Sequence, residues 1–259
     1  MTTSDSPTPT PTPTHAAYSD ETRYNYGRVR GLGLLSLPSA TAPALGAEVR
    51  ALLAASGVAE CKWERIRSAR GRFAAEKLLT WTLAAASAGR LRVDVLTWDA
   101  EDGAALPYLA RLRQQYARLV GEILPRRWPA GSRFALFPDE QAAMPWPALV
   151  AGMPHVASIA PRRSEAEPLI QVADLFAGLG AYSRGNYATY EAWLCYPPAE
   201  RARDLRRPCL PFSASDRMRC ALLDDFYTAS KFGGLGISLR TQRGLRTYTA
   251  ARPIAFWWG

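Results

Sequence analysis

Segments with the alternating pattern of β-strands come first in this 259-residue chain, and segments with helical periodicity are mixed in later. The early strand-like segments are residues 15–20, 26–37 and 91–98. In the third, Leu91, Val93 and Val95 alternate with side chains of the opposite face. A succession of helix, strand, helix, strand and helix follows over residues 106–124, 133–140, 146–153, 155–160 and 167–184. Meandering strands that pass into alternating strands and helices predict an α/β fold with a mixed sheet.

Two further helical segments, residues 39–57 and 68–89, interrupt this succession after the second strand. Ser39 or Thr41 can cap the first of them, and Gly57 ends it. With residues 41–89 set aside as a helical insertion, the order of elements matches the ribonuclease H-like topology. We therefore predict a ribonuclease H-like mixed β-sheet flanked by helices, in which the first and fourth strands lie side by side and run parallel.

The two ends of the chain differ from this core. Residues 1–14 contain a Thr-Pro repeat, which cannot bury apolar area and predicts a disordered, solvated tail. Residues 15–184 are expected to form the ribonuclease H-like domain. Residues 185–259 are expected to form a mainly helical C-terminal extension packed on that domain, closed by a short apolar ending.

The chain is basic, with a formal net charge of +9 that comes almost entirely from arginine. Arginine matches phosphate oxygens well, so a nucleic-acid partner is one reading of this charge. A composition set by GC-rich coding is the other. The oligomeric state is left open by the sequence.

The cysteine and hydropathy patterns indicate where in the cell the protein is expected to be found. The four cysteines form no C-x-x-C pair, and only two histidines are present, so a Cys/His zinc site is not expected. The cysteines are instead expected to be free thiols in a reducing cytoplasm. No apolar stretch is long enough to span a membrane, and the N-terminus lacks the apolar core of a signal peptide. We expect a cytoplasmic protein that does not enter a membrane.

Asp174 is the most informative acidic residue, because it lies inside the apolar helical run QVADLFAG. Burial of a carboxylate without compensation is costly and favours its neutral form, and a divalent cation is one form of compensation. A helix face that reaches water, or an ion pair with an arginine such as Arg184, would also explain the residue.

Two other acids are expected near the same edge of the sheet. Asp20 ends the first strand and Asp139 follows the fourth, and the C-terminal ends of adjacent parallel strands meet. Each acid is also compatible with an ordinary turn. Side chains alternate along a strand, so Asp20 and Glu21 should not share one role, and Asp20 is the better candidate for a metal-facing acid.

Glu60 and Lys62 are separated by one residue in the segment ECKW. In extended backbone this spacing places both side chains on one face. There they could contact a metal and a phosphate, although a surface ion pair is the simpler alternative.

Four motifs, YSDETR, ECKW, FPDE and SEAEPLIQVADLFAG, occur here in the order found in the DUF3800 family, which the chain resembles over residues 15–184. That family is grouped with ribonuclease H-like folds and metal-dependent nucleases. Its closing helix motif is the most specific part of the resemblance. The sequence departs mildly at Thr22, where the family often has serine.

The resemblance implies hydrolysis of phosphodiester bonds in DNA or RNA by a two-metal mechanism with Mg²⁺ or Mn²⁺. It implies Asp20, Asp139, Asp174 and Glu60 as metal ligands and Lys62 as a group that neutralises phosphate charge. It also matches Glu21, Ser164 and Gln171 to motif positions that support the ligands. A non-catalytic module that binds nucleic acid or protein, and a phosphohydrolase acting on a small substrate, are the alternatives.

Overall fold

A six-stranded mixed sheet forms the centre of the computed structural model, which describes residues 12–22, 28–101, 106–140, 144–239 and 242–259. The strand order is β5-β4-β1-β2-β3-β8. The strands are β1 (His15–Glu21), β2 (Val29–Pro38), β3 (Arg92–Asp99), β4 (Phe134–Pro138), β5 (Val156–Ile159) and β8 (Ile254–Trp258). β1, β2 and β3 are antiparallel, whereas β4 runs parallel to β1 and β5 runs parallel to β4. The predicted α/β fold and the parallel pairing of the first and fourth strands are confirmed.

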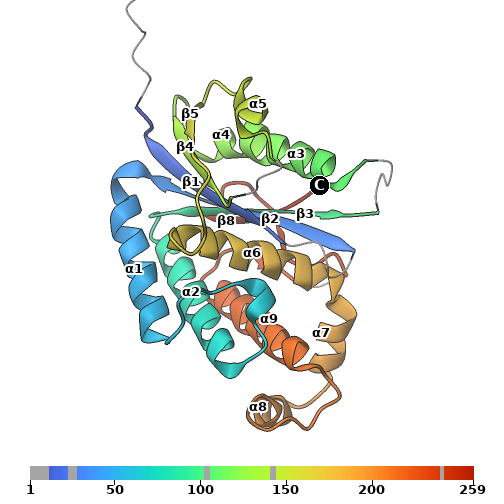
Figure 1. The fold of residues 1–259 in the computed structure, drawn as a ribbon. Coiled ribbons are helices and arrows are strands. Elements are labelled where there is room, and N and C mark those ends of the chain that lie inside the picture. The colour runs from blue at the N-terminus through green and yellow to red at the C-terminus, as the bar shows by residue number, and fades with distance from the viewer. Residues whose placement is uncertain (1–11, 23–27, 102–105, 141–143, 240–241) are drawn as a thin grey trace, which may run out of the picture.

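Helices cover both faces of this sheet (Figure 1). On one face lie α3 (Tyr108–Tyr116), η3 (Ala117–Ile123), α4 (Leu124–Arg127) and α5 (Trp146–Val150). On the other lie α1 (Ala42–Ala55), α2 (Ala69–Ser87), α6 (Pro168–Gly185) and α9 (Ala214–Phe232). The segment predicted as one helix over 106–124 thus contains a π-helical stretch, next to Pro125, whose nitrogen cannot donate the hydrogen bond of a regular turn.

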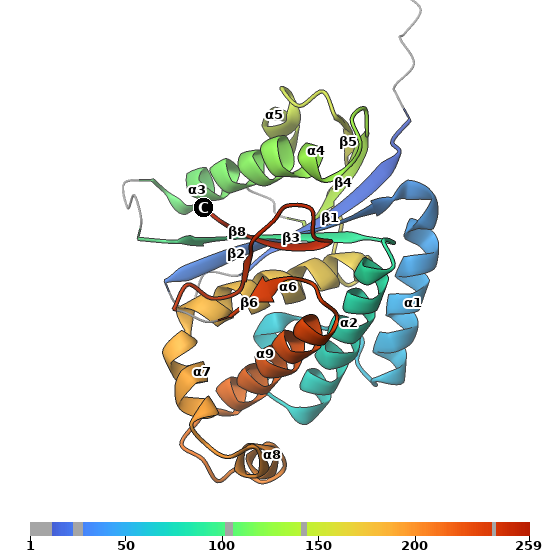
Figure 2. The same cartoon turned by 180° about the vertical axis from the view of Figure 1, so that it is seen from behind.

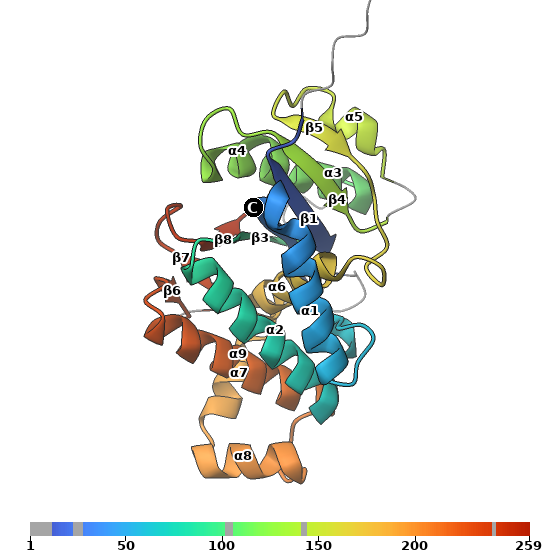
Figure 3. The ribbon, with the colours of Figure 1, turned by 90° about the vertical axis from the view of Figure 1, so that its left-hand side faces the viewer.

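The side view in Figure 3 shows the sheet between these two layers. Alternation along the strands divides the core, so Tyr18, Leu35 and Val93 are buried on the α6 side, and Leu34 and Trp98 on the α3 side. Almost every side chain of α6 is buried, which explains its apolar composition.

Two glycines of β2 let α6 lie directly on the sheet. A Cβ at Gly33 would lie 2.2 Å from the carbonyl oxygen of Ala173, and one at Gly31 would lie 2.3 Å from that of Ala177. The close approach fixes the height of α6 above the sheet, and therefore the position of Asp174, which follows Ala173 in the chain.

The insertion after β2 contains α1, the short turn η2 (Trp63–Arg65) and α2. Neither Ser39 nor Thr41 caps α1 through its side chain, contrary to the prediction, because α1 continues directly from the 3₁₀ turn η1 (Ser39–Thr41). The Thr41 hydroxyl instead donates to the carbonyl of Pro38 at 2.9 Å.

The C-terminal extension is largely helical, with α7 (Tyr187–Leu194), α8 (Pro198–Arg206) and α9, followed by the short strands β6 (Ile237–Ser238) and β7 (Arg246–Thr247). Helix α9 packs against α2. The apolar ending forms β8, which adds a sixth strand parallel to β3 (Figure 2). A ribonuclease H-like core with a helical extension does not anticipate this last strand.

Two expectations fall partly outside the described residues: the Thr-Pro tail, over residues 1–11, and the strand expected over 26–37, at residues 26 and 27. Thr14, placed in the tail by the sequence, belongs to the fold, because its backbone bonds with Arg133 and Ser39 at 2.9 Å each. In the described part of the chain, no helix combines the length and apolar character that a membrane crossing requires.

Candidate active site

Asp20 and Asp139 meet at the C-terminal ends of β1 and β4. The backbone nitrogen of Asp139 donates to the carbonyl of Ser19 at 2.8 Å, which aligns the two strand ends. Lys62, immediately before η2, places its Nζ 2.9 Å from Asp20 Oδ2 and 3.4 Å from Asp139 Oδ2. The two carboxylate oxygens are therefore no farther apart than the sum of these distances. The side chains of Lys62 and Asp20 are only 11% and 5% exposed, so this is a buried bridge.

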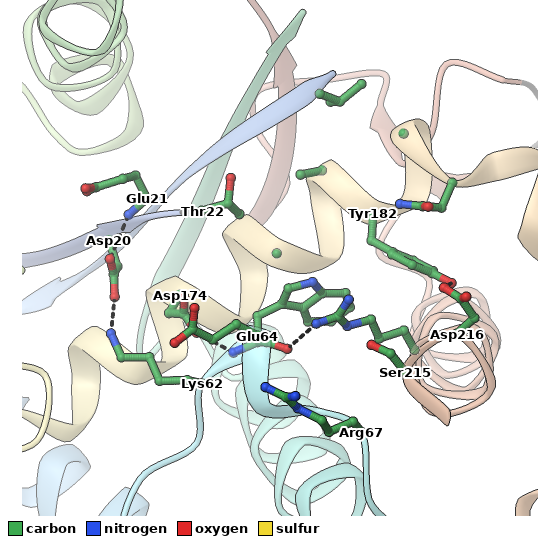
Figure 4. Close-up of a pocket in the computed structure, with 17 residues that line it drawn as sticks. Asp20, Glu21, Thr22, Lys62, Glu64, Arg67, Asp174, Tyr182, Ser215 and Asp216 are labelled. Atoms are coloured by element: carbon green, nitrogen blue, oxygen red, sulfur yellow. Dashed lines mark hydrogen bonds and ion pairs between the residues drawn. The ribbon is translucent and has the colours of Figure 1, made fainter. Parts of the chain in front are cut away.

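Asp174 reaches the same region from α6. Its Oδ2 accepts a hydrogen bond from the backbone nitrogen of Trp63 at 2.6 Å, which ties the start of η2 to α6. Figure 4 shows Asp174 beside Lys62 and Glu64, and Asp20 directly above the Lys62 ammonium. Two acids from different elements thus face one lysine.

Burial and mutual repulsion make ionisation of the two acids unfavourable. Burial, and next the charge of Asp174, raise the pKa of Asp20 well above its usual range, and Lys62 only partly offsets them. Burial also raises the pKa of Asp174 to about 6, against the opposing effects of Lys62 and the Trp63 N–H. Burial disfavours the charge of Lys62, but the neighbouring aspartates outweigh it and raise the lysine's pKa. One ammonium does not neutralise the group, and an added cation would stabilise the ionised carboxylates.

The other predicted residues form a polar network behind this group. Ser164 donates through its nitrogen to Asp139 Oδ1 and through its hydroxyl to Glu60 Oε1, at 3.0 Å each. The second oxygen of Glu60 accepts from Arg65 at 2.6 Å. Glu60, predicted as a metal ligand, is therefore engaged in structural contacts.

Gln171 links this network to the insertion. Its side-chain nitrogen donates to the carbonyl of Ser164 at 2.8 Å, and its side-chain oxygen accepts from the backbone nitrogen of Cys61 at 2.9 Å. Because Cys61 immediately precedes Lys62, Gln171 holds the segment from which the lysine extends.

Glu21 points away from its neighbour Asp20 (Figure 4). Its carboxylate lies 3.4 Å from the hydroxyl of Tyr116, which belongs to the helical layer on the opposite face of the sheet. The expected division between these two acids follows from the strand alternation.

A cavity of about 680 Å³ opens beside the acids and extends along α6. Asp20, Glu21, Lys62 and Asp174 are among its lining residues, whereas Asp139 and Glu60 do not line it. Glu64, Arg67 and Arg219 also line the cavity and are absent from the sequence-based set. Glu64 directly follows the ECKW motif and Arg67 lies three residues further on, so the motif could have drawn attention to them. Arg219 lies on α9, far beyond the motifs, and nothing in the sequence marks it.

In the described ranges, no group of three or more His, Cys, Asp or Glu residues is arranged to hold a metal ion. Mg²⁺, however, is commonly held by one or two carboxylates, with water and substrate phosphate completing its shell. Asp20 and Asp174 have the right chemistry for one such ion and line the same cavity, and Asp20 would have to exchange its contact with Lys62 to bind it. A second ion would require Asp139 to exchange its contact with Lys62.

Comparison with known proteins gives relatives but no activity. No family model matches the chain. A protein of Methanothermobacter thermautotrophicus described as uncharacterized protein ORF2′ is 31% identical, over 93% of this chain and 92% of its own length. Uncharacterized protein ORF2 of the same organism is 28% identical over the same shares.

Proposed function

The chain belongs to the same protein family as ORF2′ of Methanothermobacter thermautotrophicus, and we propose that it is a metal-dependent hydrolase of phosphodiester bonds in nucleic acid. The observation that carries this proposal is the pair Asp20 and Asp174. Two buried carboxylates from separate elements line one cavity, and the pKa of each is raised, first by burial and only in part offset by Lys62. Perturbed acids gathered in a cavity are typical of catalytic sites.

Asp20 and Asp174 would hold Mg²⁺ or Mn²⁺, which when bound supplies Lewis-acid activation of water and of the phosphate. Lys62, beside the same acids, would neutralise charge on the scissile phosphate. Asp139, Ser164, Glu60 and Gln171 keep the lysine and its segment in place through the contacts described above. The resemblance to the DUF3800 family supports the same residues, and DNA and RNA remain equal candidates.

We also propose that the protein works in the cytoplasm. Cys61, Cys195, Cys209 and Cys220 are all free thiols, as expected in a reducing compartment.

The Lys62 bridge favours a second candidate. An ammonium already lies between Asp20 and Asp139, where a cation would otherwise stabilise them. A non-catalytic, basic nucleic-acid-binding module on the same fold would keep this bridge permanently.

A cleavage assay separates the two candidates. The purified protein is incubated with end-labelled single- and double-stranded DNA and RNA, in Mg²⁺, Mn²⁺ or EDTA. Cleavage that needs the metal and is lost in Asp174→Asn, but is retained in Glu122→Gln on the opposite helical layer, is the expected result. Equal cleavage by Asp174→Asn would identify a contaminant and overturn the proposal. Binding without cleavage would favour the module.

A further inference from the structure

The cavity continues well beyond the acids. Its floor is one face of α6, where Asp174, Gly178, Ala181 and Gly185 recur at helical spacing. At a rise of about 1.5 Å per residue, this face is about 16 Å long from the first of these residues to the last. The cavity is therefore longer than the reaction at a single phosphate requires.

Two arginines line the cavity together with Trp63. Arg219 is partly buried on α9, and its Nη2 donates to the carbonyl of Trp63 at 3.0 Å. Its guanidinium lies over the Trp63 ring, 5.3 Å from the centroid. The Nε atom of Arg219 is buried and has no hydrogen-bond partner. The guanidinium is thus fixed by protein contacts, yet part of its hydrogen-bonding capacity is unused.

Arg67 joins Arg219 from the segment after η2. Its side chain is exposed and extends toward the cavity in Figure 4. Burial lowers the pKa of Arg219, and the charge of Arg67 adds to this effect, against the opposing effects of Tyr182, Asp216 and Asp174. Asp216, the acid on the same wall, already accepts hydrogen bonds from Tyr182 at 3.1 Å and from Ser213 at 2.6 Å. An anion bound in the cavity against both arginines would offset their like charge and accept hydrogen bonds from them.

We propose that Arg67 and Arg219 form a second anion subsite, which holds a phosphate of the substrate other than the one at the acids. The inference rests on the proposed function for the position of the reacting phosphate. It specifies the substrate class as a molecule with at least two phosphates along the α6 face. A single-stranded nucleic-acid backbone and a small nucleoside diphosphate share this chemistry.

Binding in EDTA tests the subsite without the reaction. A fluorescein-labelled single-stranded hexanucleotide is titrated into the full chain carrying Asp174→Asn, alone and combined with Arg67→Ala or Arg219→Gln. Arg113→Ala, on α3 across the sheet, is the matched control for lost charge. We expect at least a fivefold weaker affinity in the Arg67→Ala and Arg219→Gln proteins. The slope of log K against log salt should also fall by about 0.7 for each lost phosphate contact.

The outcomes are separable. If Arg67→Ala and Arg219→Gln bind the hexanucleotide as tightly as Arg113→Ala does, the subsite is overturned, whether or not the wild type cleaves. Because Arg219 also holds Trp63, a loss in Arg219→Gln alone would indicate a structural role and would overturn the subsite as stated. ADP titrated as a competitor of the hexanucleotide shows which of the two kinds of molecule supplies the bound phosphate. Failure of ADP to compete indicates a strand backbone, and competition that depends on both arginines indicates a small diphosphate. Absence of cleavage by the wild type would refute only the proposed function.

Discussion

Gly33→Ala should destabilise the fold and displace the candidate site. The new Cβ would lie 2.2 Å from the carbonyl oxygen of Ala173, whereas ordinary contact begins at 3.4 Å. Because the obstruction is backbone, no side chain can turn away, and α6 must rise from β2 by about 1 Å. Overpacking of this kind costs about 1–3 kcal/mol.

The displacement should affect function more than stability. Asp174 follows Ala173, so its carboxylate would move with the helix relative to Asp20 and Lys62. A misplacement of about 1 Å in a catalytic group can lower the rate about 100-fold. Urea denaturation gives the free energy of unfolding, and the Mg²⁺-dependent cleavage assay gives the rate.

Gly46→Ala is the matched control. Gly46 is buried in α1, but a Cβ there would find its nearest neighbours at 3.9 Å. Alanine in a helix is favoured over glycine by about 1 kcal/mol, so this substitution should be neutral or stabilising. If Gly33→Ala unfolds at the same urea concentration as the wild type, the helix is not held at this height by the glycine, and the reasoning fails.

Three other perturbations address the charged groups. In EDTA, the free energy of unfolding of Asp174→Asn, measured by urea denaturation, should equal that of the wild type at pH 4 and exceed it by about 3 kcal/mol at pH 7. The reason is that the pKa of Asp174 is raised from 3.8 to about 6 in the folded state, so the wild type loses stability as the pH rises through this range. Lower stability of the variant at both pH values would contradict this. Lys62→Met leaves Asp20 and Asp139 without their shared ammonium and should cost about 3–5 kcal/mol. Added Mn²⁺ should raise the Tm of this variant more than that of the wild type, and equal shifts would argue against a cation site at these acids. Arg127→Met breaks the fully buried pair with Asp94, whose atoms lie 2.8 Å apart, and should also cost about 3–5 kcal/mol by urea denaturation; a cost below about 1 kcal/mol would show that this pair contributes little.

The approach of Asp20 to Asp139 could be predicted because it depends on topology. Once β1 and β4 are taken as parallel neighbours, their C-terminal ends must meet. Alternation likewise separates Glu21 from Asp20. Both results need only the period of a strand and the order of elements.

Other features of the site depend on contacts that no local pattern encodes. The spacing of Glu60 and Lys62 predicts a shared face, but the structure turns Glu60 to Ser164 and Arg65, and Lys62 to the aspartates. Arg219 reaches the cavity only because α9 packs against α2. β8 lacks clear alternation, and its partner β3 is distant in sequence, so its place in the sheet could not be inferred.

The pairing of β3 with β8 has a consequence for synthesis of the chain. Val93 pairs with Ile254, so one side of β3 has no partner until the residues of β8 have been made. At about 5–20 residues per second, the intervening chain takes roughly ten to thirty seconds to translate. During that time the backbone N–H and C=O groups of β3 form an open sheet edge, which is the kind of surface that pairs with other chains and aggregates. Truncation before Ile254 would make this transient hazard permanent.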